Sequence, residues 1–210
     1  LELTRRSARL KRAATQPSVT QPRASGTKPS TGTNCGEDLK PYLAASSDLN
    51  IKDPVVAELA RKAAGDEKDP VELAVKLCRF VHDYIETKDL SVGFATASEV
   101  ARSRQGDCTE HGVLLAALGR ACGIPSRIVT GIVYTDDFAG QKNVFVGHLW
   151  TQFLLAGEWV DVDAAFNQTD VDPTHIALGL SAAGDSGMAD LVASGWLGLG
   201  KIVLKVIDVK

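Results

Sequence analysis

The sequence predicts an α+β domain, in which a run of helices is followed by a run of strands. Two segments that begin with Asp-Pro repeat apolar residues at helical spacing, and a third helix follows them near the middle of the chain. After residue 126, apolar and polar residues alternate as they do in strands. With 210 residues and 44% hydrophobic content, the chain can bury one sizeable core, or one core plus an extension. One folded domain is therefore expected.

The N-terminal part of the chain differs from the rest in charge and composition. Residues 1–34 contain seven Arg and Lys residues against a single acid, whereas the whole chain carries a net charge of −3. Residues 14–34 are mostly Pro, Ser, Thr and Gly and have almost nothing to bury. Residues 1–36 are therefore predicted to form a disordered basic linker, and residues 37–210 the folded domain.

A basic arm can bind nucleic acid or anionic lipid, but it can also be a simple tether. No zinc-finger spacing, P-loop or GxGxxG motif accompanies it. We therefore expect a tether and no nucleic-acid partner.

Cellular location is weakly constrained by the sequence. No stretch reaches the roughly 18 consecutive apolar residues of a membrane span, and the first residues lack the apolar centre of a signal peptide. No stable membrane insertion is therefore expected. The sequence begins at Leu1 rather than Met, as a processed or excised portion of a longer protein would. A location outside the cytoplasm, as part of a larger membrane-anchored or secreted protein, is favoured by a small margin.

The two Asp-Pro segments predict helices over residues 53–65 and 69–88. Asp is a good N-cap, and proline is well tolerated at the first helical position. In the second helix the apolar spacing predicts a buried stripe, so its cysteine is expected to be a core thiol and His82 a surface or satisfied core residue. Residues 91–107 predict a loop with one helical turn. The stripe consists of Val71, Val75, Leu77, Cys78, Val81 and Ile85.

The third helix is predicted to begin at a cysteine. Asp107 can act as its N-cap with Glu110 in the capping-box position, and Gly123 and Pro125 end it. The run from residue 113 to 118 is apolar all round, which predicts a central, buried helix. Cys108 then occupies the first helical position, where the helix dipole favours the thiolate form. A buried, inert cysteine is the alternative.

The segment after residue 126 predicts one strand, followed by two strands joined at Ala156 and Gly157. If that hairpin loop holds two residues, Trp150 faces Asp163 across the two strands. Asp163 is then the diagonal neighbour of His148 on the same face, within side-chain reach. Asp161 shares this face but lies too far along the strand to orient His148.

The order Cys, His, Asp matches the nucleophile, base and orienting residue of papain-like thiol enzymes. Three ordered segments resemble the transglutaminase-like superfamily: "RQGDCTEHGVLLAALGRACGIPSRIVTG", "GHLWTQF" and "EWVDVDAAFNQ". The resemblance covers roughly residues 53–180. It implies a helical layer on an antiparallel sheet, with Cys108 as the catalytic nucleophile, His148 as the base and Asp163 as its orienting partner.

The chain departs from the animal transglutaminases at one point. Those enzymes place a tryptophan upstream of the cysteine as an oxyanion donor, whereas the tryptophans here all follow Cys108. The backbone N–H of Cys108 is a plausible first donor, and the second donor is unassigned. Nothing resembles the calcium-binding segments of that family, so no metal and no cofactor are expected. His111 is expected to be packed or solvated, and His175 structural or at the rim of the site.

These residues predict a thiol-dependent acyl-transfer enzyme that acts on peptide or glutamine amides. The same triad serves both hydrolysis and transamidation. A peptidase or amidase is slightly favoured over a protein-crosslinking transamidase, because the chain resembles bacterial members that lack the regulatory domains of the animal enzymes. The expected partner is a protein or peptide substrate. The alternative is a non-catalytic protein-binding module that keeps the same fold. The oligomeric state is open, and so is the state of Cys35 and Cys122, which could form a disulfide or both be free.

Overall fold

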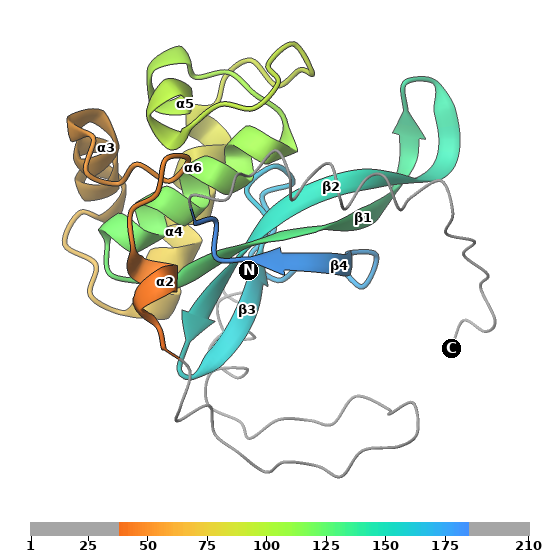
Figure 1. Ribbon diagram of the computed structural model, residues 1–210. Coiled ribbons are helices and arrows are strands. Elements are labelled where there is room, and N and C mark those ends of the chain that lie inside the picture. The colour runs from red at the N-terminus through yellow and green to blue at the C-terminus, as the bar shows by residue number, and fades with distance from the viewer. Residues whose placement is uncertain (1–37, 185–210) are drawn as a thin grey trace, which may run out of the picture.

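The computed structural model describes residues 38–184 and shows a layer of helices packed against one antiparallel sheet (Figure 1). Five helices and four strands make up this part of the chain. The helices precede the strands in sequence, so the α+β class predicted from the sequence is confirmed. Both the predicted linker and the Cys35 side chain lie outside the described residues. None of the described helices is both long enough and apolar enough to cross a membrane.

The helices begin where local sequence signals place them. Asp53 and Asp69 cap α3 (Pro54–Ala64) and α4 (Pro70–Tyr84), and each carboxylate accepts a hydrogen bond from the first backbone N–H groups of its helix. The predicted stripe of α4, including Cys78, is buried. A short helix, α2 (Lys40–Leu43), precedes them and was not predicted.

Two further helices lie next to each other in sequence. In the segment predicted as a loop with one helical turn, Thr96 and Glu99 form a capping box, which extends the turn into the seven-residue α5 (Ala97–Ser103). The central helix α6 (Cys108–Ala121) begins at the predicted cysteine, and the predicted capping box of Asp107 and Glu110 is present. Helix α6 lies between the sheet and the other helices (Figure 1).

The sheet has the strand order β3-β2-β1-β4 and is antiparallel throughout. Strands β1 (Ser126–Phe138) and β2 (Gln141–Leu155) form a long hairpin, and β3 (Glu158–Val162) follows through a turn of two residues, Ala156 and Gly157. Both turn residues have positive φ, as a type I′ hairpin turn requires. The second edge strand, β4 (Ile176–Ser181), was not predicted.

Close contact between α6 and β2 sets the position of the helix start. A Cβ atom at Gly112 would lie 2.3 Å from the side chain of Leu149, and one at Gly119 would lie 2.3 Å from the ring of Phe153. Gly112 and Gly119 lie about two turns apart on the same face of α6, and their lack of side chains lets the helix backbone approach the strand closely. The Thr151 hydroxyl donates a hydrogen bond to the Gly112 carbonyl across the same interface. This packing brings the N-terminus of α6 to the part of β2 that carries His148.

Candidate active site

Cys108 and His148 line the same cavity. The cavity has a volume of about 640 Å³ and lies where the start of α6 meets the outer part of the β1–β2 hairpin. The loop after α4 and the turn after β3 complete its wall. The ladder between β2 and β3 stops at the pair Thr151 and Val162, so the part of β2 that carries His148 has no β3 partner. The site is therefore built where the sheet edge opens beside the helix start.

Cys108 is partly buried at the first position of α6, as predicted. The sequence led us to expect a thiol biased toward thiolate, and the structure differs on this point. Burial raises the pKa of the Cys108 thiol to about 12, and the neighbouring Asp107 carboxylate adds to the increase. Hydrogen bonds from the Leu149 backbone and from Thr109 oppose these effects without cancelling them. The resting group is therefore a neutral thiol that needs a base to become a nucleophile.

His148 and Asp163 are in direct contact. The turn of two residues gives the predicted register, in which Leu154 pairs with Trp159 and Gln152 with Asp161. His148 Nε2 lies 2.7 Å from Asp163 Oδ2, and both side chains are buried. This contact leaves the Nδ1 nitrogen of His148 as the one that can take a proton. The expected side-chain contact is therefore present, but the expected pairing of Trp150 with Asp163 is not, because β3 ends at Val162 and Asp163 pairs with Gln168 instead.

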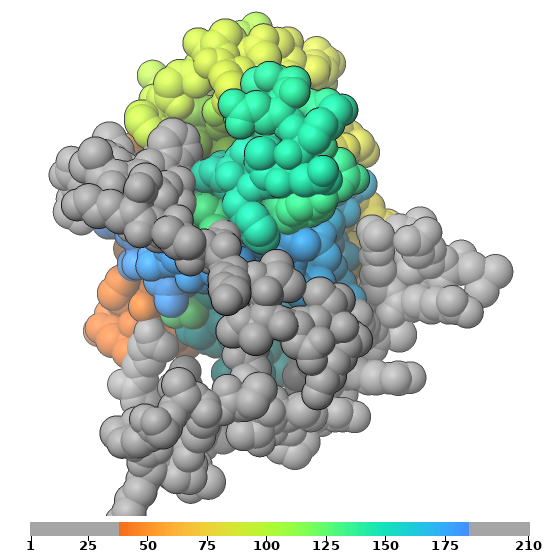
Figure 2. All heavy atoms as spheres, turned by 90° about the vertical axis from the view of Figure 1, so that its right-hand side faces the viewer, coloured from red at the N-terminus to blue at the C-terminus, as the bar shows by residue number. Residues whose placement is uncertain are grey.

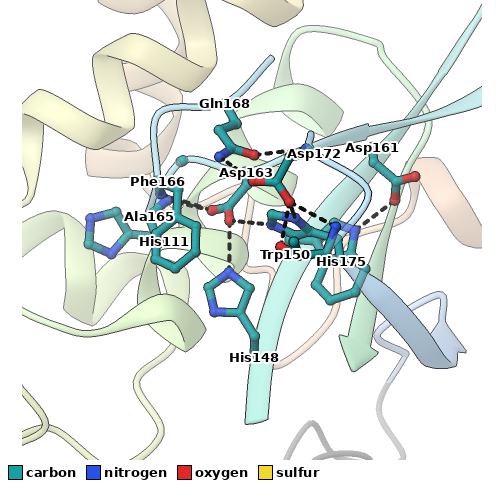
Figure 3. Close-up of polar contacts among 12 residues, drawn as sticks. His111, His148, Trp150, Asp161, Asp163, Ala165, Phe166, Gln168, Asp172 and His175 are labelled. Carbon is teal, nitrogen blue, oxygen red and sulfur yellow. Dashed lines mark hydrogen bonds and ion pairs between the residues drawn. The ribbon is translucent and has the colours of Figure 1, made fainter. Parts of the chain in front are cut away.

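Asp163 is held as a carboxylate by several hydrogen-bond donors (Figure 3). Its Oδ1 accepts hydrogen bonds from the backbone N–H groups of Ala165 and Phe166, at 2.7 and 3.2 Å. Burial alone would raise the pKa of Asp163, but the hydrogen bonds from His148 and His175 outweigh burial and hold the pKa well below its usual range. Asp163 is therefore ionised near neutral pH.

His175 is a second imidazole on Asp163, whereas a structural position or one at the rim of the site was expected. Its Nε2 lies 3.1 Å from Asp163 Oδ2, and its Nδ1 lies 3.4 Å from Asp172 Oδ1 (Figure 3). Burial favours the neutral form, but Asp163 and then Asp172 outweigh it and raise the pKa of His175 above its usual value. Carboxylates at both ring nitrogens favour the imidazolium form. No period or spacing in the sequence connects His175 to a residue twelve positions earlier.

Aromatic rings enclose the His148 side chain. Phe166 stacks on His148 with ring centroids 4.8 Å apart, and Trp150 stacks on it at 6.0 Å. The indole N–H of Trp150 donates a hydrogen bond to Asp161 Oδ1 at 2.6 Å, so Asp161 positions Trp150 and does not contact His148. Trp159 lies elsewhere, under the guanidinium of Arg127 and beside Tyr42. Of Trp150 and Trp159, therefore, Trp150 contacts the site residues.

Two other titratable residues near Cys108 are buried. His111 lines the cavity, its Nδ1 lies 2.5 Å from the Asp107 carbonyl, and its Nε2 has no partner among the residues described. Burial lowers the pKa of His111 to about 4, so the ring is neutral near pH 7. Burial, followed by the charge of Asp107, raises the pKa of Glu110 to about 7. Glu110 Oε1 also accepts a hydrogen bond from the Ala95 backbone, which ties the preceding loop to α6.

Three of these side chains are close enough to bind a metal ion. One ligand atom each from His148, Asp163 and His175 lies within 4.8 Å of the others. The contacts already described account for these atoms, because both imidazole Nε2 groups lie at hydrogen-bond distance from the same carboxylate oxygen. Hydrogen bonding within the chain therefore explains the arrangement without a metal.

Two known proteins resemble the chain over part of their length. An uncharacterized protein from Haemophilus influenzae is 29% identical over 149 residues, which make up 61% of this chain and 40% of that protein. The crystal structure of a "putative cysteine protease" from Cytophaga hutchinsonii superposes with a TM-score of 0.60 at 20% identity, covering 71% of this chain and 48% of the other. The chain thus spans less than half the length of these relatives, and the structural likeness shows the same fold.

A family model supplies the assignment. Residues 57–164 match the model of the transglutaminase-like superfamily. The matched region begins in α3 and ends one residue after Asp163. It therefore includes Cys108, His148 and Asp163. With just over half of its length matched to that model, the chain belongs to the transglutaminase-like superfamily.

Proposed function

We propose that the chain is a thiol-dependent acyl-transfer enzyme that acts on peptide or glutamine amides through Cys108, His148 and Asp163. One observation carries this proposal: Cys108 and His148 line one cavity while Asp163 holds the far nitrogen of His148. This is the arrangement of nucleophile, base and orienting group that covalent acyl transfer requires. The name of the Cytophaga hutchinsonii protein is consistent with such chemistry.

The chemistry follows from the neutral thiol. Because the pKa of Cys108 is raised to about 12, its proton passes to His148 Nδ1 as the sulfur attacks the amide carbonyl carbon. Asp163 stabilises the imidazolium that forms. The developing oxyanion would be stabilised by the Cys108 backbone N–H at the start of α6. The C–N bond then breaks, the leaving amine or ammonia takes the proton from His148, and the acyl group stays on sulfur as a thioester.

A second nucleophile releases the acyl group. Water gives a carboxylic acid, whereas a primary amine such as a lysine side chain gives a new amide. In both cases His148 accepts the proton of the nucleophile and returns one to sulfur. We favour hydrolysis slightly.

Mass spectrometry of a peptide mixture incubated with the protein, with and without a primary amine, tests the proposal. Peptide cleavage indicates a peptidase, and loss of ammonia without cleavage indicates deamidation or transamidation. Incorporation of the amine separates the latter two. We expect one of these products in the wild-type reaction and none with Cys108→Ala. An unchanged peptide mixture would favour the alternative, a non-catalytic module that binds protein through the same fold.

A further inference from the structure

The cavity that contains Cys108 and His148 has charged residues at its wall, but each of them is already engaged within the chain. Lys88 Nζ donates a hydrogen bond to the His82 carbonyl at 2.6 Å. Asp89 accepts one from the Ser91 backbone at 2.9 Å, and Asp107 caps α6 by accepting one from Thr109 at 2.7 Å. Asp137 forms an ion pair with Lys142. These contacts use part of the hydrogen-bonding capacity of each charged group and hold it against its own chain.

The remaining wall is mostly apolar and exposed. Leu90 is 70% exposed, Phe138 42% and Phe166 43%, and all three line the cavity together with Val146 and Ala165. In Figure 2 the outer end of the β1–β2 hairpin (teal) lies beside the yellow-green segment around residue 90. Large apolar side chains from three separate segments thus converge on the opening that leads to Cys108. Covering such surface stabilises a complex by roughly 25 cal/mol per Å² of apolar area.

Phe166 connects this apolar wall to the reacting centre. Its ring stacks on His148, so a substrate group in contact with Phe166 lies next to the amide that Cys108 attacks. The volume of about 640 Å³ is large enough for the amide together with a neighbouring large side chain. We propose that this cavity selects acyl donors that carry a large apolar or aromatic side chain beside the reacting amide. The inference rests on the proposed function for its chemistry, but selective binding can be measured without turnover.

Binding to the Cys108→Ala protein tests the selectivity directly, with Cys108→Ser as a second inactive form if the alanine protein does not fold. The probes are blocked pentapeptides with a central glutamine, flanked on both sides by Phe, Leu, Ala, Lys or Asp. We expect Phe and Leu peptides to bind at least about tenfold more tightly than Ala peptides, because removing buried methylene groups typically costs that much. Lys and Asp peptides should bind no better than Ala peptides.

Two phenylalanines of the same hairpin provide a matched control. Phe138 lines the cavity, whereas Phe145 is similarly exposed, at 41%, but does not line it. Phe138→Ala should reduce the preference for Phe peptides several-fold, and Phe145→Ala should leave it unchanged. Equal effects of the two substitutions, or equal binding of apolar and charged peptides, would overturn the inference.

The outcomes also separate this inference from the proposed function. Selective binding without turnover by the wild-type protein would refute the acyl-transfer activity and leave the apolar selectivity in place. Turnover without preference would refute the selectivity alone. Sedimentation of the same variants tests whether a second copy of the chain, instead of a peptide, covers the apolar wall. If Phe138→Ala abolishes self-association and no peptide preference exists, the apolar wall is an interface between two copies and the inference is wrong.

Discussion

Asp163 is the residue of the site on which hydrogen bonds from several segments converge. Its two oxygens accept hydrogen bonds from two imidazoles and two backbone N–H groups. The thiol of Cys78 and the ring of His82, both on α4, contact the backbone carbonyls of Asp163 and Ala164. Helix α4 therefore supports the turn that holds Asp163, although no residue of α4 belongs to the proposed triad.

The two aspartates at the end of the hairpin should differ sharply in their effect on activity. Asp163→Asn keeps the shape of the side chain but cannot stabilise the imidazolium of His148, and we expect turnover to fall by about 10⁴. Asp161→Asn should have a mild effect, because Asp161 contacts Trp150 and Gln152 and not His148. Turnover of both variants, with circular dichroism to verify folding, checks this ranking. A larger loss in Asp161→Asn would contradict the assignment of Asp163.

His175 should act on the reaction through Asp163. His175→Gln can keep an N–H donor toward Asp163 but carries no charge, whereas His175→Ala removes both. The pKa of His175 is raised above 6.5, so wild-type His175 loses its proton above that pH, and the full charge of Asp163 can then stabilise the protonated form of His148. A stabilised imidazolium favours the thiolate of Cys108. We therefore expect a step upward in the rate of Cys108 alkylation by iodoacetamide. This step should be absent in His175→Gln. A purely structural His175 would change stability in both variants and leave the step in place.

Among the elements, the N-terminus of α6 combines several functions. It carries Cys108, it packs closely on β2 through Gly112, and its capping residue Glu110 binds the backbone of Ala95. The loop before α5, which includes part of the cavity wall, is thereby connected to the nucleophile helix. Because the Glu110 side chain is buried, its protonation is expected to affect the stability of the fold.

Replacement of Glu110 by Gln should change how stability depends on pH. The pKa of Glu110 is raised from 4.5 to about 7, so between these values the folded state holds a proton that the unfolded chain has lost. The contribution of this group to stability is therefore complete below about pH 4.5 and declines as the pH rises through about 7. The free energy of unfolding of the wild type, minus that of Glu110→Gln, should decrease from pH 5 to pH 8. Denaturant unfolding of both proteins measures it, and the titration of His111 cancels in the difference. A constant or rising difference would be inconsistent with a buried, protonated Glu110.

For the molecule as a whole, the described residues form one helical layer and one sheet with the site at their junction. Every residue of the proposed triad lies between α6 and the turn after β3. Helices α3 and α4 both pack against α6, and α4 also contacts β2 (Figure 1). This organisation predicts that residues 1–36 are dispensable for folding and for the site.

Removal of residues 1–36 should leave the melting temperature and the reactivity of Cys108 unchanged. These residues have few apolar side chains to offset an ordering entropy of about 1–2 kcal/mol per residue, so they should not contribute to the core. Thermal unfolding and Cys108 alkylation of the shortened and full chains measure both effects, and they should be repeated with reductant. A melting temperature of the full chain that falls only on reduction would reveal a disulfide between Cys35 and Cys122. A drop of many degrees on removal would show that the N-terminal segment packs on the domain.

The sequence by itself determined those features that depend on neighbouring residues in the chain. Asp-Pro pairs and a capping box mark helix starts because they satisfy the first backbone N–H groups locally, which placed Cys108 at the beginning of α6. The turn at Ala156 and Gly157 sets the register of the hairpin up to the pair Thr151 and Val162, and Asp163 follows one residue later, within reach of His148. Both inferences need only residues that are close in sequence or paired through one turn.

Only the tertiary structure decided the electrostatic state of the site and its outer wall. The helix dipole at Cys108 could be read from the sequence, but the burial that outweighs it and raises the pKa to about 12 depends on packing against β2. The position of His175 depends on the chain returning to form β4 beside β1, a pairing with no signal in the local pattern. The cavity joins Leu90, Phe138 and Phe166 from three separate segments. Burial and long-range pairing depend on how distant segments pack together, and therefore neither is encoded in any short stretch of the chain.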